Sequence, residues 1–366
     1  MSNIIDYVKV ARDGFDSRPF CEVDSLVLSQ FSYLQFNGFV PGISSLDGSI
    51  SIRELMEQDN LEWLFLGVRD HKSNLKLLLA LADSPRFQDV RMSRYVDHTD
   101  QVQEKQFSAI TFLITDGIAY VAFRGTDSTF VGWKEDFNMA FLNPVPSQVE
   151  GVRYLNSFIG NPYSTMLVGG HSKGGNIAVY ASMHCEQCIQ DRIQVIFSHD
   201  GPGFSEDIFQ SENYAKIKFK ILKTVPQSSL IGMLLQQQED FKVVKSDRFW
   251  IMQHDPFSWL VEGFDFQYAI NMSGNASYFN RVLNKWVSSF DMKQREVFVE
   301  SFYLVIKSTN AKTFRDLLFN KKEKAFAAVN AIKDIDDDTR RFMLNTFGSL
   351  FVLLVRDIDK YGLWKT

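Results

Sequence analysis

A glycine-rich segment near the middle of the chain contains a serine that could act as a nucleophile. Residues 170–175 read Gly-His-Ser-Lys-Gly-Gly, which places Ser172 in a G-x-S-x-G motif. An apolar run typical of a strand precedes the motif at 166–168, and small residues compatible with a helix cover 176–181. A strand that turns into a helix this abruptly presents its serine at a sharp tip. The pattern predicts Ser172 as a catalytic nucleophile; the alternative is a glycine-rich connection without chemistry.

The same turn predicts a site for negative charge. Ser172 would stand at the N-terminus of the following helix, where backbone N–H groups lack intrahelical acceptors and the helix dipole favours an anion. The N–H of Lys173 is placed to bind an oxyanion. Glycine fits positions 170 and 174 because a side chain there would collide with the neighbouring strand or helix.

A serine hydroxyl also needs a base, so one of the six histidines must approach Ser172. In strand–elbow–helix hydrolases the acid and then the histidine follow the serine along the chain. His254, in a loop-like stretch at 250–259, fits this order. The others precede the serine, adjoin it, lie on the next helix or leave no room for an acid: His71, His98, His171, His184 and His199. We predict His254 as the general base; the alternative is a surface-loop histidine.

The elements that must position these residues follow from hydrophobic periodicity. Residues 1 to about 85 show helical spacing, with helices expected from about 24 to 34, at 51–58 and at 75–82. From 89 to 125 the period changes to two, which predicts strands at 91–96, 107–115 and 119–123. Asp116-Gly117 between the last two predicts a hairpin.

Strands and helices alternate after this hairpin. A helix is expected at 149–159, followed by the strand before Ser172, the helix after it, and strands at 193–198 and 215–223. This alternation predicts right-handed βαβ units and a largely parallel sheet. Such a sheet places its ligands beyond the carboxyl ends of the strands, where Ser172 is expected.

A second motif supports this assignment. Residues 122–127 read Ala-Phe-Arg-Gly-Thr-Asp, and Trp133 and Asp136 follow about ten residues later. Together with the serine motif, this pattern resembles the class 3 lipase group of α/β-hydrolases, and most closely a bacterial lipase-like subgroup. The resemblance implies that Thr126 supplies the second oxyanion-hole donor through its backbone N–H and its hydroxyl, and it also places a histidine near 254. Arg124 and Asp136 are expected to pair with each other and brace this loop.

The acid departs from the lipase pattern. Class 3 lipases usually carry it in the loop after the next strand, yet residues 224–230 contain no carboxylate. Asp200, at the predicted carboxyl end of the strand before that loop, is the expected substitute. A turn-capping role for Asp200 is the alternative. Asp240 and Asp247 are more distant candidates, and Asp255 is too close to His254 along the chain to orient its ring.

The resemblance implies an α/β-hydrolase fold, with a mostly parallel central sheet, antiparallel N-terminal strands and a helical C-terminal extension. We expect a hydrolase domain at 1–275 and a helical region at 276–366 that packs on it. Helices are expected around Trp286, around Phe302, at 326–332 and from Asp336 onward. An amphipathic face of this region could contact a membrane or a partner, but core packing is the favoured interpretation.

Composition narrows the functional classes. The net charge of −5 argues against a nucleic-acid binder. Three cysteines make no disulfide framework, and the Cys185–Cys188 pair lacks a second pair to complete a zinc site, so no metal or cofactor is expected. With no secretion signal and no apolar run of about 20 residues, we expect a cytoplasmic protein.

We therefore predict a serine hydrolase that cleaves a carboxylic ester through Ser172, His254 and Asp200, with the N–H groups of Thr126 and Lys173 as the oxyanion hole. A lipid ester is implied only by the resemblance. The same residues would serve a thioesterase, an amidase or an acyltransferase. A binding protein that keeps the scaffold without catalysis is the alternative from another class, and the missing acid at 224–230 supports it.

Overall fold

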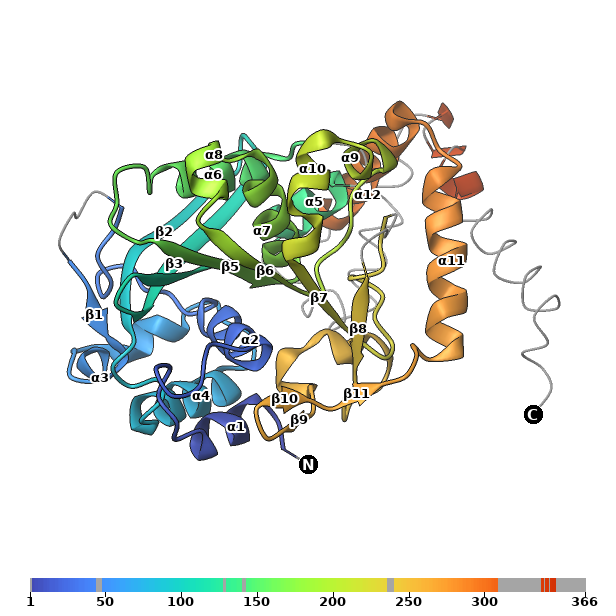
Figure 1. Cartoon of the computed structure of the whole chain (residues 1–366). Coiled ribbons are helices and arrows are strands. Elements are labelled where there is room, and N and C mark those ends of the chain that lie inside the picture. Colours follow the sequence, from blue (N-terminus) through green and yellow to red (C-terminus); the bar gives the residue numbers. More distant parts are fainter. Residues whose placement is uncertain are drawn as a thin grey trace.

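The computed structural model describes residues 2–43, 48–127, 130–139, 143–235, 240–308, 337–338, 340–341 and 343–346. Within these residues, nine strands form one sheet in the order β1-β2-β3-β4-β5-β6-β7-β8-β11 (Figure 1). The strands are β1 Ile50–Ser51, β2 Arg91–Asp100, β3 Lys105–Thr115, β4 Ile118–Phe123, β5 Thr165–His171, β6 Ile193–His199, β7 Ile221–Pro226, β8 Phe241–Val244 and β11 Tyr268–Ala269. A separate antiparallel ribbon pairs β9 Val261–Glu262 with β10 Asp265–Phe266.

The direction of the strands divides the sheet into a parallel centre and antiparallel edges. Neighbours from β4 to β8 run parallel. The strands from β1 to β4 are antiparallel, and so is the last pair, β8 with β11. A parallel centre, with a sharp turn after β5 and helices on both faces, is an α/β-hydrolase fold, as the sequence predicts.

The helices belong to three groups. Those before β2 are α1 Ile4–Val10, α2 Glu22–Phe31, α3 Ile52–Leu55, the 3₁₀ helix η1 Leu61–Phe65 and α4 His71–Asp83. Those between and after the central strands are α5 Phe130–Asn138, α6 Pro146–Asn156, α7 Lys173–His184, α8 Gln187–Gln190, α9 Glu206–Phe209, α10 Glu212–Ile217 and the 3₁₀ helices η2 Lys218–Lys220, η3 Trp250–His254 and η4 Pro256–Ser258. The last group comprises α11 Gly274–Ser288 and α12 Met292–Ser308.

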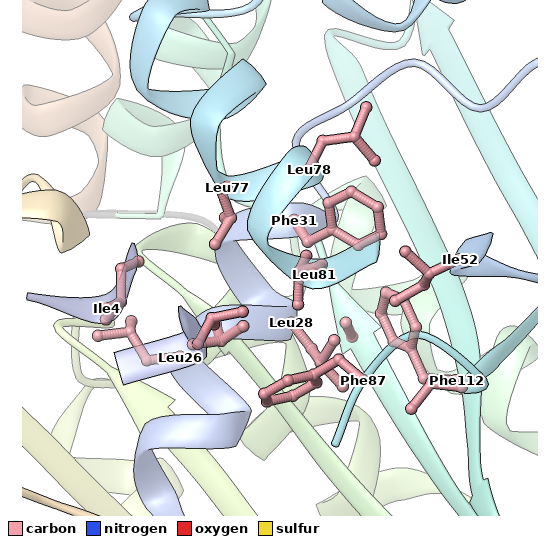
Figure 2. Close-up of a cluster of buried hydrophobic side chains, with 14 of the residues drawn as sticks. Ile4, Leu26, Leu28, Phe31, Ile52, Leu77, Leu78, Leu81, Phe87 and Phe112 are labelled. Carbon is pink, nitrogen blue, oxygen red and sulfur yellow. The ribbon is translucent and has the colours of Figure 1, made fainter. Parts of the chain in front are cut away.

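Two hydrophobic cores lie on opposite faces of the sheet. Successive side chains of a strand point to opposite faces, so Tyr120 and Ala122 of β4 join one core, whereas Val121 and Phe123 join the other. The first core packs under the early helices α1, α2 and α4, and Figure 2 shows Phe112 of β3 in one cluster with leucines of α2 and α4, with Phe31 of α2 and with Phe87. The second core packs under α6, α7 and α10 (Figure 1). The central strands are therefore buried on both faces. A functional site can form only at the ends of the strands, and the sequence places it at their carboxyl ends.

The strands predicted at 91–96, 107–115, 119–123 and 193–198 are confirmed with small changes of boundary. The predicted hairpin is also confirmed, since Thr115 pairs with Ile118 and Gly117 has a φ of 82°. Such a positive φ favours glycine, which has no Cβ to clash. Helices α2, α3 and α4 occupy the segment where the sequence predicts helices before β2.

The strand predicted at 215–223 is wrong over residues 215–220. Residues 212–217 form α10, and β7 begins only at Ile221. Lysines alternate with apolar residues here and imitate a strand, but Ser211 caps a helix by accepting a hydrogen bond from the N–H of Tyr214. Tyr214 and Ile217, three residues apart, are both buried, which is the spacing of a helix face.

The two described C-terminal helices follow the predicted positions around Trp286 and Phe302. Helix α12 lies against α5, where Lys134 Nζ is 2.8 Å from a carboxylate oxygen of Glu300. The helix predicted at 326–332 lies outside the described residues, and only parts of the last predicted helix, at 337–346, lie within them. In the described part of the chain, no helix has both the length and the apolar character that crossing a membrane requires.

Candidate active site

Ser172 occupies the sharp turn between β5 and α7. Its φ of 59° and ψ of −132° lie outside the ordinary regions for a non-glycine residue. The flanking glycines allow this turn: a Cβ on Gly174 would lie 2.0 Å from the carbonyl oxygen of Phe123, and a Cβ on Gly170 would lie 2.4 Å from the carbonyl carbon of Gly174. The collision predicted from the sequence at both positions is confirmed.

The side chains of Ser172, His254 and Asp200 form one hydrogen-bonded row. Ser172 Oγ lies 2.9 Å from His254 Nε2. On the other side of the ring, His254 Nδ1 lies 2.6 Å from Asp200 Oδ2. Because a carboxylate only accepts, Nδ1 carries the proton and Nε2 of the neutral ring is free to accept the serine proton. A nucleophile, a base and an orienting acid in this sequence of contacts can perform nucleophilic catalysis.

The parallel sheet brings the serine and the acid together. Strands β5 and β6 are neighbours, and their last residues, His171 and His199, are paired in register. Ser172 and Asp200, which directly follow these histidines, therefore both lie at the carboxyl edge of the sheet. The N–H of Ser172 donates to the carbonyl of His199 at 2.9 Å. The histidine comes from later in the chain, at the end of the short helix η3 after β8.

Residues 224–230, at the end of β7 and the start of the loop after it, contain no carboxylate but contact the acid directly. Ser229 Oγ donates to Asp200 Oδ1 at 2.5 Å, and the N–H of Gly232 donates to the same oxygen at 3.2 Å. Both Asp200 and Ser229 are buried. Sequence reasoning missed Ser229. The one signal for it in the sequence is that residues 224–230 carry hydroxyl side chains at the place where class 3 lipases usually carry the acid.

Thr126 follows β4, the neighbour of β5, and lines the same cavity as Ser172. Its hydroxyl oxygen lies 2.7 Å from both carboxylate oxygens of Asp136. Burial raises the pKa of Asp136 from 3.8 to about 6, so at neutral pH the carboxylate is ionised and accepts the hydrogen bond that the hydroxyl donates. The hydroxyl therefore anchors the loop, and the backbone N–H is the group left to donate to an oxyanion.

The predicted pairing of Arg124 with Asp136 is wrong. The Arg124 guanidinium forms two hydrogen bonds with the Asp97 carboxylate of β2, at 2.8 and 3.1 Å. The N–H of Arg124 bonds to the carbonyl of Ser108, which pairs with Asp97 across the sheet, so the arginine lies within reach of that acid. Asp136 is left to hold Thr126.

Lys173, the first residue of α7, has a backbone N–H without an intrahelical acceptor. Its side chain points into the protein, where Nζ donates to Glu135 Oε2 at 2.7 Å and to the carbonyl of Gln106 at 2.8 Å. The two side chains are 1% and 0% exposed, so the pair is buried. The N–H and the ammonium of this residue therefore belong to different environments.

His171, which precedes Ser172, forms a hydrogen bond with the backbone of His254. Its Nε2 lies 2.8 Å from the carbonyl oxygen of His254, and its Nδ1 lies 3.0 Å from the hydroxyl of Tyr33. Burial, and then the nearby His254, lower the pKa of His171 well below 6.5, so the ring is neutral. A carbonyl only accepts, so Nε2 is the protonated nitrogen and Tyr33 donates to Nδ1.

The row of side chains opens into a cavity of about 630 Å³. This volume is typical of a small-molecule site. Most of the lining is apolar and comes from the residue after α5, the loop after β7, η3, α11 and α12, with Met139, Leu234, Ile251, Trp286 and Val299 among the contributors. Met252 is 60% exposed and also lines the cavity. The cavity therefore suits an apolar group.

No cluster of three His, Cys, Asp or Glu side chains that could hold a metal occurs among the described residues. Cys185 is buried and Cys188 is exposed, and both are free thiols. His199 is buried between Ser25 and Thr224, and burial lowers its pKa to about 3. These residues give the site no further ligand set.

The chain is similar to known proteins in sequence and in fold. The model of the Mbeg1-like family matches residues 81–304. No curated protein matches the chain. Similar solved structures include a deletion mutant of the Rhizomucor miehei lipase in its propeptide complex, with 14% identity, a TM-score of 0.40, and coverage of 66% of this chain and 77% of that one. A lipase from Rhizopus microsporus var. chinensis has 16% identity, a TM-score of 0.32, and coverage of 55% and 72%.

Proposed function

The chain belongs to the Mbeg1-like family, and we propose that it is a serine hydrolase that cleaves a carboxylic ester. The observation that carries this proposal is the row from Ser172 Oγ through His254 to Asp200, with contacts of 2.9 and 2.6 Å. The positive φ of Ser172 supports it, because a strained serine at the end of a strand is the geometry of a nucleophile elbow. The apolar cavity beside the serine supports an acyl group as the occupant.

In the first half of the proposed reaction, Ser172 Oγ attacks the ester carbonyl carbon while His254 Nε2 takes the hydroxyl proton. Asp200 keeps the ring in the required tautomer and stabilises the imidazolium that forms. The carbonyl oxygen becomes an oxyanion, which the N–H groups of Thr126 and Lys173 bind. When the tetrahedral intermediate collapses, the alcohol leaves with the proton from His254, and the acyl group stays on Ser172.

In the second half, water attacks the acyl carbon and passes a proton to His254. The second tetrahedral intermediate collapses, Ser172 recovers its proton from His254, and the carboxylic acid is released. No metal or organic cofactor takes part in these steps. We further propose that the substrate is a lipid-like ester with an apolar acyl chain. The apolar lining of the cavity supports this proposal.

A fluorophosphonate probe tests the nucleophile. We expect wild-type protein to be labelled, Ser172→Ala to remain unlabelled, and Ser164→Ala, which changes an exposed serine before β5, to be labelled like wild type. Hydrolysis of p-nitrophenyl esters from acetate to palmitate then measures chain preference. If folded wild-type protein neither reacts with the probe nor hydrolyses any ester, the proposal is wrong and a non-catalytic scaffold is favoured.

Other acyl donors and another acyl acceptor could use the same residues. Thioesters and amides would form the same acyl-enzyme, and an alcohol in place of water would give acyl transfer. Offering glycerol or a thiol during ester turnover, and measuring the ester or thioester formed against free acid, separates hydrolysis from transfer.

A further inference from the structure

The acid of the row is held by a loop that closes around it. Asp200 is fully buried, and among the described residues His254 is its only ion-pair partner. One oxygen, Oδ2, faces His254 Nδ1, and the other, Oδ1, accepts from Ser229 Oγ at 2.5 Å and from Gly232 N at 3.2 Å. These two bonds fix the rotation of the carboxylate, and with it the direction in which Oδ2 faces the histidine.

A second observation shows that the loop is fitted to the carboxylate. A Cβ added to Gly232 would lie 2.3 Å from Asp200 Oδ1 and 3.0 Å from Ser229 Oγ. Real Cβ atoms do not approach polar atoms this closely, so any side chain at 232 would push the loop away from the acid. Only glycine allows the backbone N–H and the serine hydroxyl to reach the same oxygen.

Ser229 is in turn fastened to a helix outside the central sheet. Its carbonyl accepts a hydrogen bond from Asn280 Nδ2 of α11 at 2.7 Å, and Asn280 is 4% exposed. Four residues later on the same face, Asn284 Nδ2 donates to the carbonyl of Met233 at 2.7 Å. Helix α11 also supplies Leu283 and Trp286 to the wall of the cavity.

We propose that Ser229 is a positioning residue for the acid of the triad, and that Asn280 of α11 holds it in place. The proposal rests on the proposed serine-hydrolase function. It assigns a role to residues 224–230, which contain no carboxylate: this segment supplies the hydroxyl that orients an acid located one strand earlier. It also makes α11 part of the catalytic unit, through the path Asn280–Ser229–Asp200–His254.

The first test separates turnover from binding. Ser229 does not line the cavity, so Ser229→Ala should leave KM within about twofold while kcat falls about ten- to hundredfold, the range expected for losing a hydrogen bond to a charged group. Ser228→Ala is the matched control, because that hydroxyl contacts Ser273 and not the acid. Its kcat should match wild type. In an Asp200→Ala background, Ser229→Ala should have no further effect on kcat.

The second test examines the helix. Asn280→Ala should lower kcat in the same direction, and this effect should disappear in the Ser229→Ala background. Asn284→Ala is the matched control, since it removes a similar bond from the same helix but acts on Met233. Equal losses for the two asparagine variants would indicate general loosening of α11 and would overturn the role of Asn280.

A spectroscopic measurement decides the inference without relying on activity. The proton on His254 Nδ1, in its 2.6 Å contact with Asp200, should give a downfield NMR resonance that shifts in Ser229→Ala and not in Ser228→Ala. An unchanged resonance together with unchanged kcat would overturn the inference. If wild-type protein shows no hydrolysis and no probe labelling, the proposed function fails, and the resonance alone still decides whether Ser229 orients the acid.

Discussion

Replacing Lys173 by methionine should cost stability and leave the chemistry intact. The ammonium is 1% exposed and donates to Glu135, which is 0% exposed. Lys173→Met keeps the length of the side chain but leaves the Glu135 carboxylate buried without its cation. Breaking a buried pair in this way typically costs about 3–5 kcal/mol. The backbone N–H at 173, which we propose as an oxyanion donor, is unaffected by the substitution.

A double-mutant cycle makes this expectation quantitative. Glu135 also accepts from the backbone N–H groups of Gln106 and Ser147, at 3.0 and 2.9 Å. In Glu135→Gln, the side-chain amide oxygen can still accept one of these two hydrogen bonds, and the negative charge is removed. Because the double variant buries no unpaired charge, it should be more stable than either single variant. Free energies of unfolding from urea titration provide the measurement.

The result that would refute this reasoning is additivity. If the double variant loses the sum of the two single losses, the side chains do not act as an ion pair. Activity gives the second criterion: folded Lys173→Met should react with the fluorophosphonate probe within about tenfold of the wild-type rate, equivalent to about 1.4 kcal/mol. A far larger loss, measured at a temperature where the variant is fully folded, would show that the side chain acts in the reaction.

Three further outcomes are expected. Trp286→Ala should enlarge the cavity and raise kcat/KM for palmitate relative to butyrate esters by about threefold or more; an unchanged ratio would exclude Trp286 from the acyl wall. Thr126→Val, which removes the hydroxyl held by Asp136, should lower kcat by about tenfold or more, whereas Thr126→Ser should retain activity; equal activity in both variants would contradict the anchoring role. Burial lowers the pKa of His199 from 6.5 to about 3. The folded state therefore binds a proton on this ring less tightly than the unfolded chain does, and the free energy of unfolding decreases as the pH falls below 6.5. In His199→Gln the acid-side slope of unfolding free energy should be shallower by about 1.4 kcal/mol per pH unit, and an unchanged slope would contradict the assignment.

The parts of the fold that were predictable have local causes. The turn at Ser172 follows from glycines that must lie against Phe123, and the hairpin at Gly117 from a positive φ. The order of serine, acid and histidine in the chain then led to His254 and Asp200, which the fold brings into contact with Ser172. Their catalytic roles stay predictions until the labelling and turnover experiments are made.

The parts that were not predictable depend on contacts between distant segments. Ser229 meets Asp200 across 29 positions, and Asn280 meets Ser229 across 51. No period or motif connects such residues, because the contact exists only when β6, β7 and α11 are in place. The pairing of Arg124 was mispredicted for the same reason, since its partner Asp97 lies on β2, 27 positions earlier.

Helix α5 shows how a short charged run can have a structural role that its composition conceals. Three consecutive residues, Lys134, Glu135 and Asp136, would ordinarily be assigned to a solvated face. In the structure Lys134 contacts Glu300 of α12, Glu135 contacts Lys173 of α7, and Asp136 holds the hydroxyl of Thr126. Because successive residues of a helix point about 100° apart, one turn can reach three neighbours at once.

This arrangement explains why charges are buried next to an apolar cavity. The loop of Thr126, the first residue of α7 and the C-terminal helix α12 all pack around α5, and each is joined to it by a different charge. Apolar contacts alone would allow these three elements to slide, whereas an ion pair or a charged hydrogen bond fixes a distance and a direction. The charges of α5 therefore hold three segments against one helix: the loop of Thr126, the start of α7 and helix α12.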